Sequence, residues 1–152
     1  MNSCEPAVRF MRIAGFAMCG FYSGDFIMRA SSLSFLTAVV IACIGMFWGL
    51  AMAISEDHTT LSAHAHLNLL GWVSLFLFGL FYRLHPALDA ARIARLQVMI
   101  WTAGTVVMAI GVAMIRTGYP GEPLAAVGSL GVLASIVMFA WQVIRLERAS
   151  AA

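Results

Sequence analysis

Four long stretches of the chain contain no charged residue and are mostly apolar. They run over residues 33–54, 61–82, 97–115 and 124–144. About 20 apolar residues cross the hydrocarbon core of a bilayer as a helix, so each stretch is long enough to span it. The nine arginines and seven carboxylates all lie outside these stretches. Because lipid offers no partner to an open backbone, the pattern predicts an all-α integral membrane protein, a four-helix bundle.

The four stretches define one domain with a short segment on either side. We expect an N-terminal cytoplasmic or interfacial arm over 1–30, a transmembrane domain over 31–146 and a cytoplasmic tail over 147–152. Within the arm, residues 10–22 are apolar but too short to span a bilayer. They fit an interfacial helix, the apolar part of a signal peptide, or an upstream extension of a chain that begins near Met28. We favour the interfacial helix.

The arginines predict how the bundle is oriented. One side of the predicted membrane holds Arg9, Arg12, Arg29, Arg83, Arg92, Arg95, Arg145 and Arg148. The other side holds Arg116 alone, and its first loop carries Glu56 and Asp57. Basic residues accumulate in cytoplasmic loops, so both termini are predicted to be cytoplasmic, N-in and C-in.

Composition excludes several functions. Hydrophobic residues make up 62% of the 152-residue chain, charged residues 11%, and the mean hydropathy is +0.91, which excludes a water-soluble globule. A net charge of +2 is too small for a nucleic-acid-binding surface. No carboxylate or lysine lies in a predicted span, which argues against acid–base catalysis and proton-coupled transport. The three cysteines have neither CxxC nor zinc-like spacing.

The second stretch carries His64, His66 and Asn68 within its first turns. Two residues turn a regular α-helix by about 200°, so the two imidazoles point to different sides. The face of His66 is apolar and holds Leu69, Leu70, Val73, Leu77 and Leu80. The face of His64 is smaller and more polar, with Asn68, Gly71, Leu75 and Tyr82. His66 would therefore ligate haem iron or donate a hydrogen bond to a neighbouring helix. His64 would lie next to the ligand and help to position it, or would lie at an interface.

Three of the stretches contain small residues that leave part of the predicted helix surface without bulky side chains. They include Gly45, Gly49, Gly104, Gly111, Gly128 and Gly131. Small residues let helix backbones approach closely in lipid. They predict either packing within the bundle or a specific face between copies of the chain.

The second stretch resembles the second helix of haem–copper oxidase catalytic subunits, especially the nitric-oxide-reductase and cbb3-type branches. The resemblance rests on His66-Leu67-Asn68-Leu69-Leu70, where the family has a His-x-Asn pattern at the outer end of that helix. Residues 28–146 also resemble small four-helix bacterial proteins grouped with oxidase subunit I, through Ala63–Trp72 and Phe81–Leu84. The resemblance implies that His66 ligates a low-spin haem b.

The chain departs from that family in its histidine content. The family uses histidines for a low-spin haem, a high-spin haem and copper, whereas this chain has four histidines and only two in predicted spans. Copper and high-spin haem ligands have no counterpart here. This chain alone is therefore not a complete oxidase or nitric oxide reductase, and whether it is an enzyme stays open.

A low-spin haem would need a second axial ligand and partners for its propionates. The candidates for the ligand are Met52 or Met114, a second copy of the chain, or a different subunit. We favour a symmetric pair of chains, because membrane oligomers are commonly symmetric. Arg116 would pair with the propionates, or would simply extend its charge to the interface.

Together these observations predict a multi-pass protein of the bacterial inner membrane. We expect it to bind haem b through His66, as a homodimer, and to serve electron transfer or haem and redox sensing. One alternative is a non-catalytic interaction subunit of a respiratory complex. The other is a copper-binding protein that uses His58, His64, His66 and a methionine.

Overall fold

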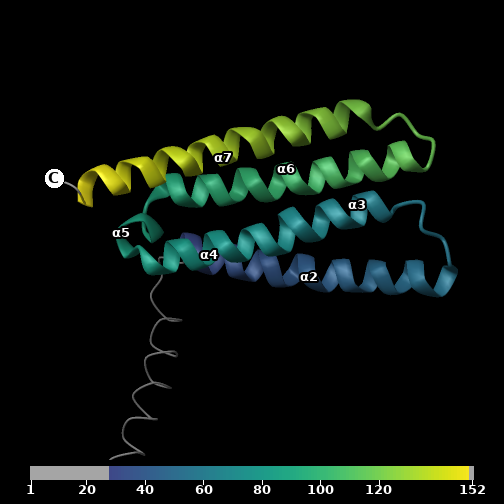
Figure 1. Cartoon of the computed structure of the whole chain (residues 1–152), viewed down its shortest axis with the longest axis horizontal. Coiled ribbons are helices and arrows are strands. Elements are labelled where there is room, and N and C mark those ends of the chain that lie inside the picture. The colour runs from purple at the N-terminus through teal and green to yellow at the C-terminus, as the bar shows by residue number, and fades with distance from the viewer. Residues whose placement is uncertain (1–27, 151–152) are drawn as a thin grey trace, which may run out of the picture.

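The computed structural model describes residues 28–150, and the regular structure of this part is entirely helical (Figure 1). In chain order the helices are α2 (Ala30–Ser55), α3 (Leu61–His66), the π-helix η1 (Leu67–Ser74), α4 (Leu75–Leu84), α5 (Pro86–Asp89), α6 (Arg92–Arg116) and α7 (Glu122–Ser150). Helices α3, η1 and α4 follow one another without a break as one long helix. The prediction of an all-α protein is confirmed.

Within the described residues, four helices are long and apolar enough to cross a membrane. They are Ala30–Ser55, Leu61–Leu84, Arg92–Arg116 and Glu122–Ala149. Each contains one predicted span and extends past it at one or both ends. A helix can continue through charged residues whose side chains reach water. α7 thereby includes most of the predicted tail. Residues 1–27, with the predicted arm and its apolar 10–22 segment, lie outside the described residues.

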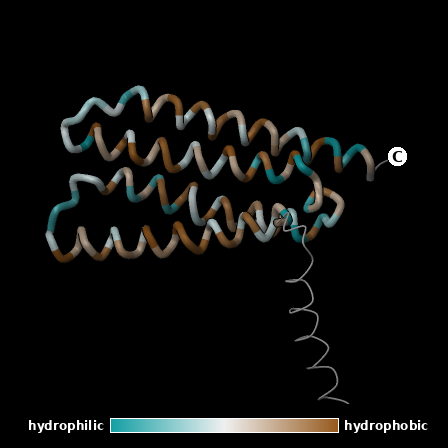
Figure 2. Tube along the Cα trace, turned by 180° about the vertical axis from the view of Figure 1, so that it is seen from behind, coloured by the Kyte–Doolittle hydropathy of each residue, from teal (hydrophilic) through white to brown (hydrophobic). Residues whose placement is uncertain are grey.

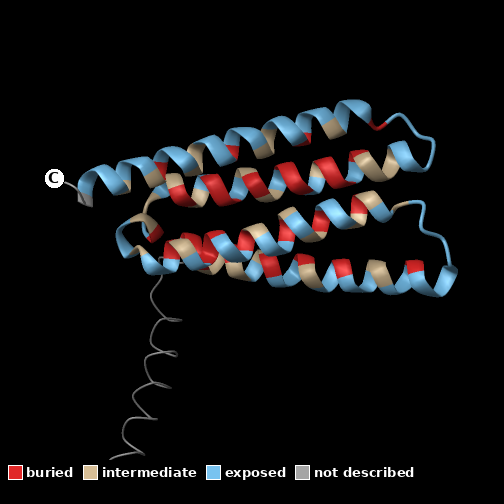
Figure 3. Cartoon of the chain, in the orientation of Figure 1, coloured by how far each residue is buried: buried red, intermediate tan, exposed pale blue. Residues whose placement is uncertain are grey.

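The bundle consists of two helical hairpins that lie side by side (Figure 1). The first pairs α2 with the long helix α3–η1–α4, and the second pairs α6 with α7. α6, which belongs to the second hairpin, also contacts both helices of the first and is the most buried of the four long helices. α7 packs mainly on α6 and is largely exposed (Figure 3). Apolar residues cover the helices along most of their length (Figure 2). The exposed sides are therefore suited to lipid or to another membrane chain.

The two ends of the bundle differ in charge. We call the end with loops 56–60 and 117–121 the loop end, and the end with α5 and the C-terminus of α7 the arginine end (Figure 1). Six described arginines lie at the arginine end, namely Arg29, Arg83, Arg92, Arg95, Arg145 and Arg148. Arg116 is the one described arginine at the loop end.

At the arginine end, α5 supplies the cap of α2. The Asp89 side chain is buried and accepts hydrogen bonds from the Ser31 backbone N–H at 2.7 Å and from the Ser31 hydroxyl at 3.0 Å. Arg29 lies 4.0 Å from the same carboxylate. The first turn of a helix has amide groups without intrahelical partners and favours negative charge. The Asp89 carboxylate, which belongs to α5, accepts the hydrogen bond of a first-turn amide of α2 and supplies the negative charge that this helix end favours.

A buried polar network joins the two hairpins. The Tyr82 hydroxyl donates to Gln97 Oε1 at 3.0 Å, and Gln97 Nε2 donates to the Ser135 hydroxyl at 3.0 Å. Gln142 Nε2 donates to the Tyr82 hydroxyl at 3.3 Å. All four side chains are buried. Sequence analysis did not predict this network, because polar residues on three helices form it only after those helices pack.

Candidate functional site

His64 and Asn68 point from the long helix toward the two glycines of the GxxxG pair in α2. A Cβ atom on Gly49 would lie 3.1 Å from Cε1 of His64, and one on Gly45 would lie 2.8 Å from Cγ of Asn68. The amide of Asn68 donates to the His64 carbonyl at 2.9 Å and lies 3.3 Å from both ring nitrogens. These glycines therefore accommodate polar side chains within the chain.

An indole, a hydroxyl group and a thioether close the loop end above His64. The indole ring of Trp48 lies edge-on to the His64 ring, with ring centroids 6.2 Å apart. Trp48 Nε1 donates to the Thr60 hydroxyl at 3.1 Å, and that hydroxyl donates to the sulfur of Met52 at 3.5 Å. The Met52 side chain is buried in this corner. His64 is thus half-buried and surrounded by its own chain.

His66 lies on a different side of the helix, and its ring is exposed. Its Nδ1 is 2.6 Å from the backbone carbonyl of Ser62. A carbonyl only accepts hydrogen bonds, so Nδ1 carries the hydrogen and Nε2 of the neutral ring keeps its lone pair. This is the arrangement that orients an imidazole for metal ligation through Nε2.

The surface that continues from His66 is apolar and exposed. Leu69, Val73 and Leu77 have exposed fractions of 61%, 39% and 57%. Beside Val73 and Leu77, Trp72 and Phe76 complete a shallow groove of about 170 Å³. A flat apolar ring system fits such a surface, since its side chains are apolar apart from the His66 imidazole and the indole N–H of Trp72. The residues of this face therefore fit a haem.

The π-helix begins at the residue after His66, which sequence analysis did not predict. Side chains from both hairpins bind carbonyls in the π-helix and at its end. Trp101 Nε1 donates to the Leu70 carbonyl, inside the π-helix, at 2.8 Å. The Ser34 hydroxyl donates to the Leu75 carbonyl at 2.6 Å. In lipid, such irregular backbone needs these partners. Short π-helical segments are common at functional sites, and this one adjoins the candidate ligand.

The remaining predicted site residues are not beside the His66 ring. Met52 lies in the buried corner below Thr60, and Met114 lines a groove between α2 and α6 whose lining does not include His66. Arg116 Nε donates to the Thr59 carbonyl at 3.3 Å, at the loop end. Within the described residues, neither methionine provides a second axial ligand on the His66 face.

The other histidines are dispersed. His58 lies in the 56–60 loop with Nδ1 3.1 Å from the Glu56 carbonyl, and His85 lies at the arginine end with Nδ1 2.7 Å from the Phe81 carbonyl. In residues 28–150, no three His, Cys, Asp or Glu side chains come together as a metal-binding group. The predicted copper set of His58, His64 and His66 is therefore not assembled within the described part of one chain.

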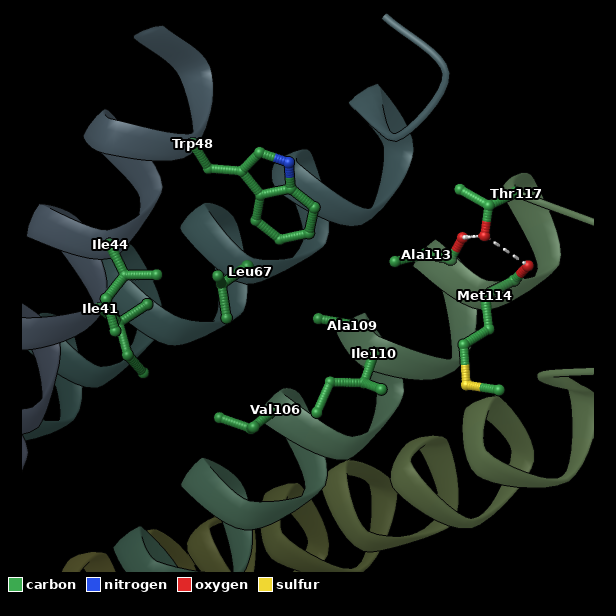
Figure 4. A pocket seen from close by; sticks show the side chains of 10 residues that line it. All are labelled: Ile41, Ile44, Trp48, Leu67, Val106, Ala109, Ile110, Ala113, Met114 and Thr117. Carbon is green, nitrogen blue, oxygen red and sulfur yellow. Dashed lines mark hydrogen bonds between the residues drawn. The ribbon is translucent and has the colours of Figure 1, made fainter. Parts of the chain in front are cut away.

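The groove that Met114 lines is the larger cavity and has a volume of about 400 Å³ (Figure 4). Its walls come from α2, from the start of η1 and from α6, and all but Thr117 and the indole nitrogen are apolar. The lining residues are Ile41, Ile44, Trp48, Leu67, Val106, Ala109, Ile110, Ala113, Met114 and Thr117. Sequence analysis did not predict this groove, because it depends on how three helices splay apart.

Comparisons with known proteins were made for the whole chain. No protein family, curated protein or solved structure matches it. The resemblance to the oxidase helix therefore rests on the His66-Leu67-Asn68-Leu69-Leu70 pattern itself.

Proposed function

We propose that this chain is a multi-pass protein of the bacterial inner membrane that binds haem b between two copies and serves electron transfer or haem and redox sensing. The observation that carries the proposal is the exposed His66 ring, with Nδ1 engaged by Ser62 and Nε2 available. A polar ring that faces lipid alone is costly, and such residues in spans are commonly functional. Ligation of iron by Nε2 removes that cost.

The second axial ligand in this proposal is His66 of a second copy. His64 is enclosed by Trp48, Gly49 and Asn68, and His58 and His85 lie at opposite ends of the bundle. A two-fold axis beside the exposed apolar face of the long helix would bring two His66 rings to one iron. The same axis would cover the exposed leucines next to them.

Each part of the face has a role in this proposal. Haem b, when bound, supplies one-electron redox chemistry. The Ser62 carbonyl holds the His66 ring in the tautomer that ligates. Leu69, Val73 and Leu77 exclude water from the ring system, which affects the redox potential. Arg116, at the same end of the bundle as His66, remains a candidate partner of the propionates.

The proposed orientation places the arginine end in the cytoplasm, N-in and C-in. Six described arginines lie at that end against one at the loop end. The excess follows the rule for cytoplasmic loops. His66 is then near the outer side of the membrane.

The decisive experiment is a reduced-minus-oxidised absorption spectrum of the full chain, purified in detergent from haem-replete cells. The wild type is expected to show haem b bands at one haem per two chains, and His66→Ala is expected to lose them. His85→Ala is the matched control, because its Nδ1 makes the same contact with the carbonyl four residues earlier. A colourless wild type, or bands that survive His66→Ala, would contradict the proposal.

The second candidate is an interaction subunit in which His66 donates a hydrogen bond to a partner helix. The exposed leucines around His66 favour it, since they fit a helix as well as a macrocycle. In that case the wild type is colourless, and His66→Ala lowers co-purification with a respiratory complex while His85→Ala does not. Metal analysis of the same samples tests the copper alternative.

A further inference from the structure

We propose that the groove between α2 and α6 is a specific site for one membrane phospholipid with a zwitterionic head that carries a primary ammonium group. One of its two acyl chains lies in the groove, the phosphate binds Arg116, and the ammonium group binds Asp57. The groove does not include His66 in its lining, and this proposal assigns to the lipid phosphate the guanidinium group of Arg116 that the proposed function offers to the haem propionates.

The shape of the groove fits a single acyl chain. Its α6 wall runs from Val106 to Thr117, which is about 16 Å along a helix and parallel to the bundle axis. Ala109 and Ala113 form part of this wall and leave room for a chain that larger side chains would fill (Figure 4). A volume of about 400 Å³ is in the range of ligand sites.

The loop end of the groove carries hydrogen-bonding groups. Thr117 lines this end, and the indole of Trp48 points its Nε1 to Thr60 while its ring faces the groove (Figure 4). Tryptophan prefers the level of lipid headgroups, because one part of the ring is apolar and the other donates a hydrogen bond. These residues therefore place the lipid head at the loop end.

Two opposite charges flank that end without neutralising each other. Thr59 accepts a hydrogen bond from Arg116 Nε at 3.3 Å through its carbonyl, and its N–H donates to Asp57 Oδ1 at 2.9 Å. Within the described residues, Arg116 and Asp57 form no ion pair with each other. The remaining guanidinium nitrogens are free for a phosphate, and the second carboxylate oxygen is free for an ammonium group.

The charge at this end favours a zwitterionic head over an anionic one. Glu56, Asp57 and Glu122 are the described carboxylates at the loop end, and Arg116 is the one described arginine there. A head with a phosphate alone would bind Arg116 but would be repelled by the carboxylates. A head that adds an ammonium group is attracted by both.

The test is native mass spectrometry of the full chain after delipidation and titration with dioleoyl phosphatidylethanolamine or dioleoyl phosphatidylglycerol. We expect one tightly bound phosphatidylethanolamine per chain, with about fivefold weaker binding of the glycerol head. Ala113→Leu fills the groove and is expected to weaken retention about tenfold. Ala140→Leu, at an exposed alanine of α7, is the matched control and is expected to bind as the wild type does.

Two charge variants separate the head from the chain. Arg116→Gln is expected to weaken both lipids, whereas Asp57→Asn is expected to weaken phosphatidylethanolamine alone. His85→Ala, at the arginine end of the bundle, is expected to leave lipid binding unchanged. Equal binding of the two lipids, retention that Ala113→Leu does not lower, or a change of oligomeric state in Ala113→Leu would overturn the proposal. Loss of haem in Arg116→Gln with lipid binding intact would also overturn it, and would assign Arg116 to the haem.

Discussion

In the hairpin of α2 with the long helix, side chains fill the space over the glycines, whereas in the hairpin of α6 with α7 the backbone of the partner helix fills it. Asn68 and His64 lie over Gly45 and Gly49. In contrast, a Cβ atom on Gly128 would lie 2.7 Å from the backbone oxygen of Gly104. The second hairpin is therefore a close backbone contact with little room for change, and the first holds polar side chains between its two helices.

The difference matches where the candidate chemistry lies. The described histidines all belong to the first hairpin and the connection after it, and the π-helix begins directly after His66. The second hairpin contributes buried Gln97, Ser135 and Gln142 to the network that holds the two hairpins together. The hairpin of α6 and α7, with its close backbone contacts, thus packs against a first hairpin whose long helix is locally irregular.

The largest expected effect comes from adding one methyl group to the backbone contact. Gly128→Ala is expected to lower the free energy of unfolding by about 2 to 3 kcal/mol, because backbone atoms of α6 cannot move aside. Gly131→Ala is the control, since its Cβ would meet α6 at 3.4 Å, an ordinary contact. Unfolding in mixed micelles measures both. Equal stability of the two variants would contradict the description of this hairpin.

A smaller effect is expected from the same change in the first hairpin. Gly45→Ala is expected to cost about 1 kcal/mol, because the Asn68 side chain can rotate away from the added methyl group. In the double variant with Asn68→Ala, the two changes should cost less than the sum of the single ones. Strict additivity, measured in the same micelles, would show that Asn68 does not occupy this space.

The smallest effect concerns the loop of the first hairpin. Hydrogen bonds from the Thr59 hydroxyl and then from its backbone N–H lower the pKa of Asp57 below its ordinary value of 3.8. Because the folded pKa is the lower one, this stabilisation is present above pH 3.8 and is lost as the pH falls through the folded pKa. The carboxyl chemical shift of Asp57 in labelled protein should titrate below that of a model peptide. A midpoint at or above 3.8 would contradict it.

The four long apolar helices were predictable because hydropathy along the chain marks such segments, and none of the described long helices has a charged residue in its apolar centre. The different faces of His64 and His66 were predictable for a further reason: the π-helix starts only at Leu67, so regular α-helical geometry still separates the two rings. Beyond Leu67 that geometry changes, and nothing in the residue pattern indicates it.

The partners of each face were not predictable. Which of the two histidines is enclosed depends on where α2 packs, and the contact of Gly49 with His64 joins residues of two different helices. Tyr82, Gln97 and Gln142 each look like isolated polar residues near the ends of apolar stretches. Their hydrogen bonds exist only across three packed helices.

The cap that Asp89 gives to α2 has a consequence for the order in which the protein is made. Asp89 is synthesised 58 residues after Ser31, so α2 leaves the ribosome before its N-terminal amide groups have this partner. The bond closes only when the second long helix has returned to the same side and α5 has folded against it. A first hairpin with the wrong length or register cannot form the bond, so the contact closes only when the two helices are correctly paired.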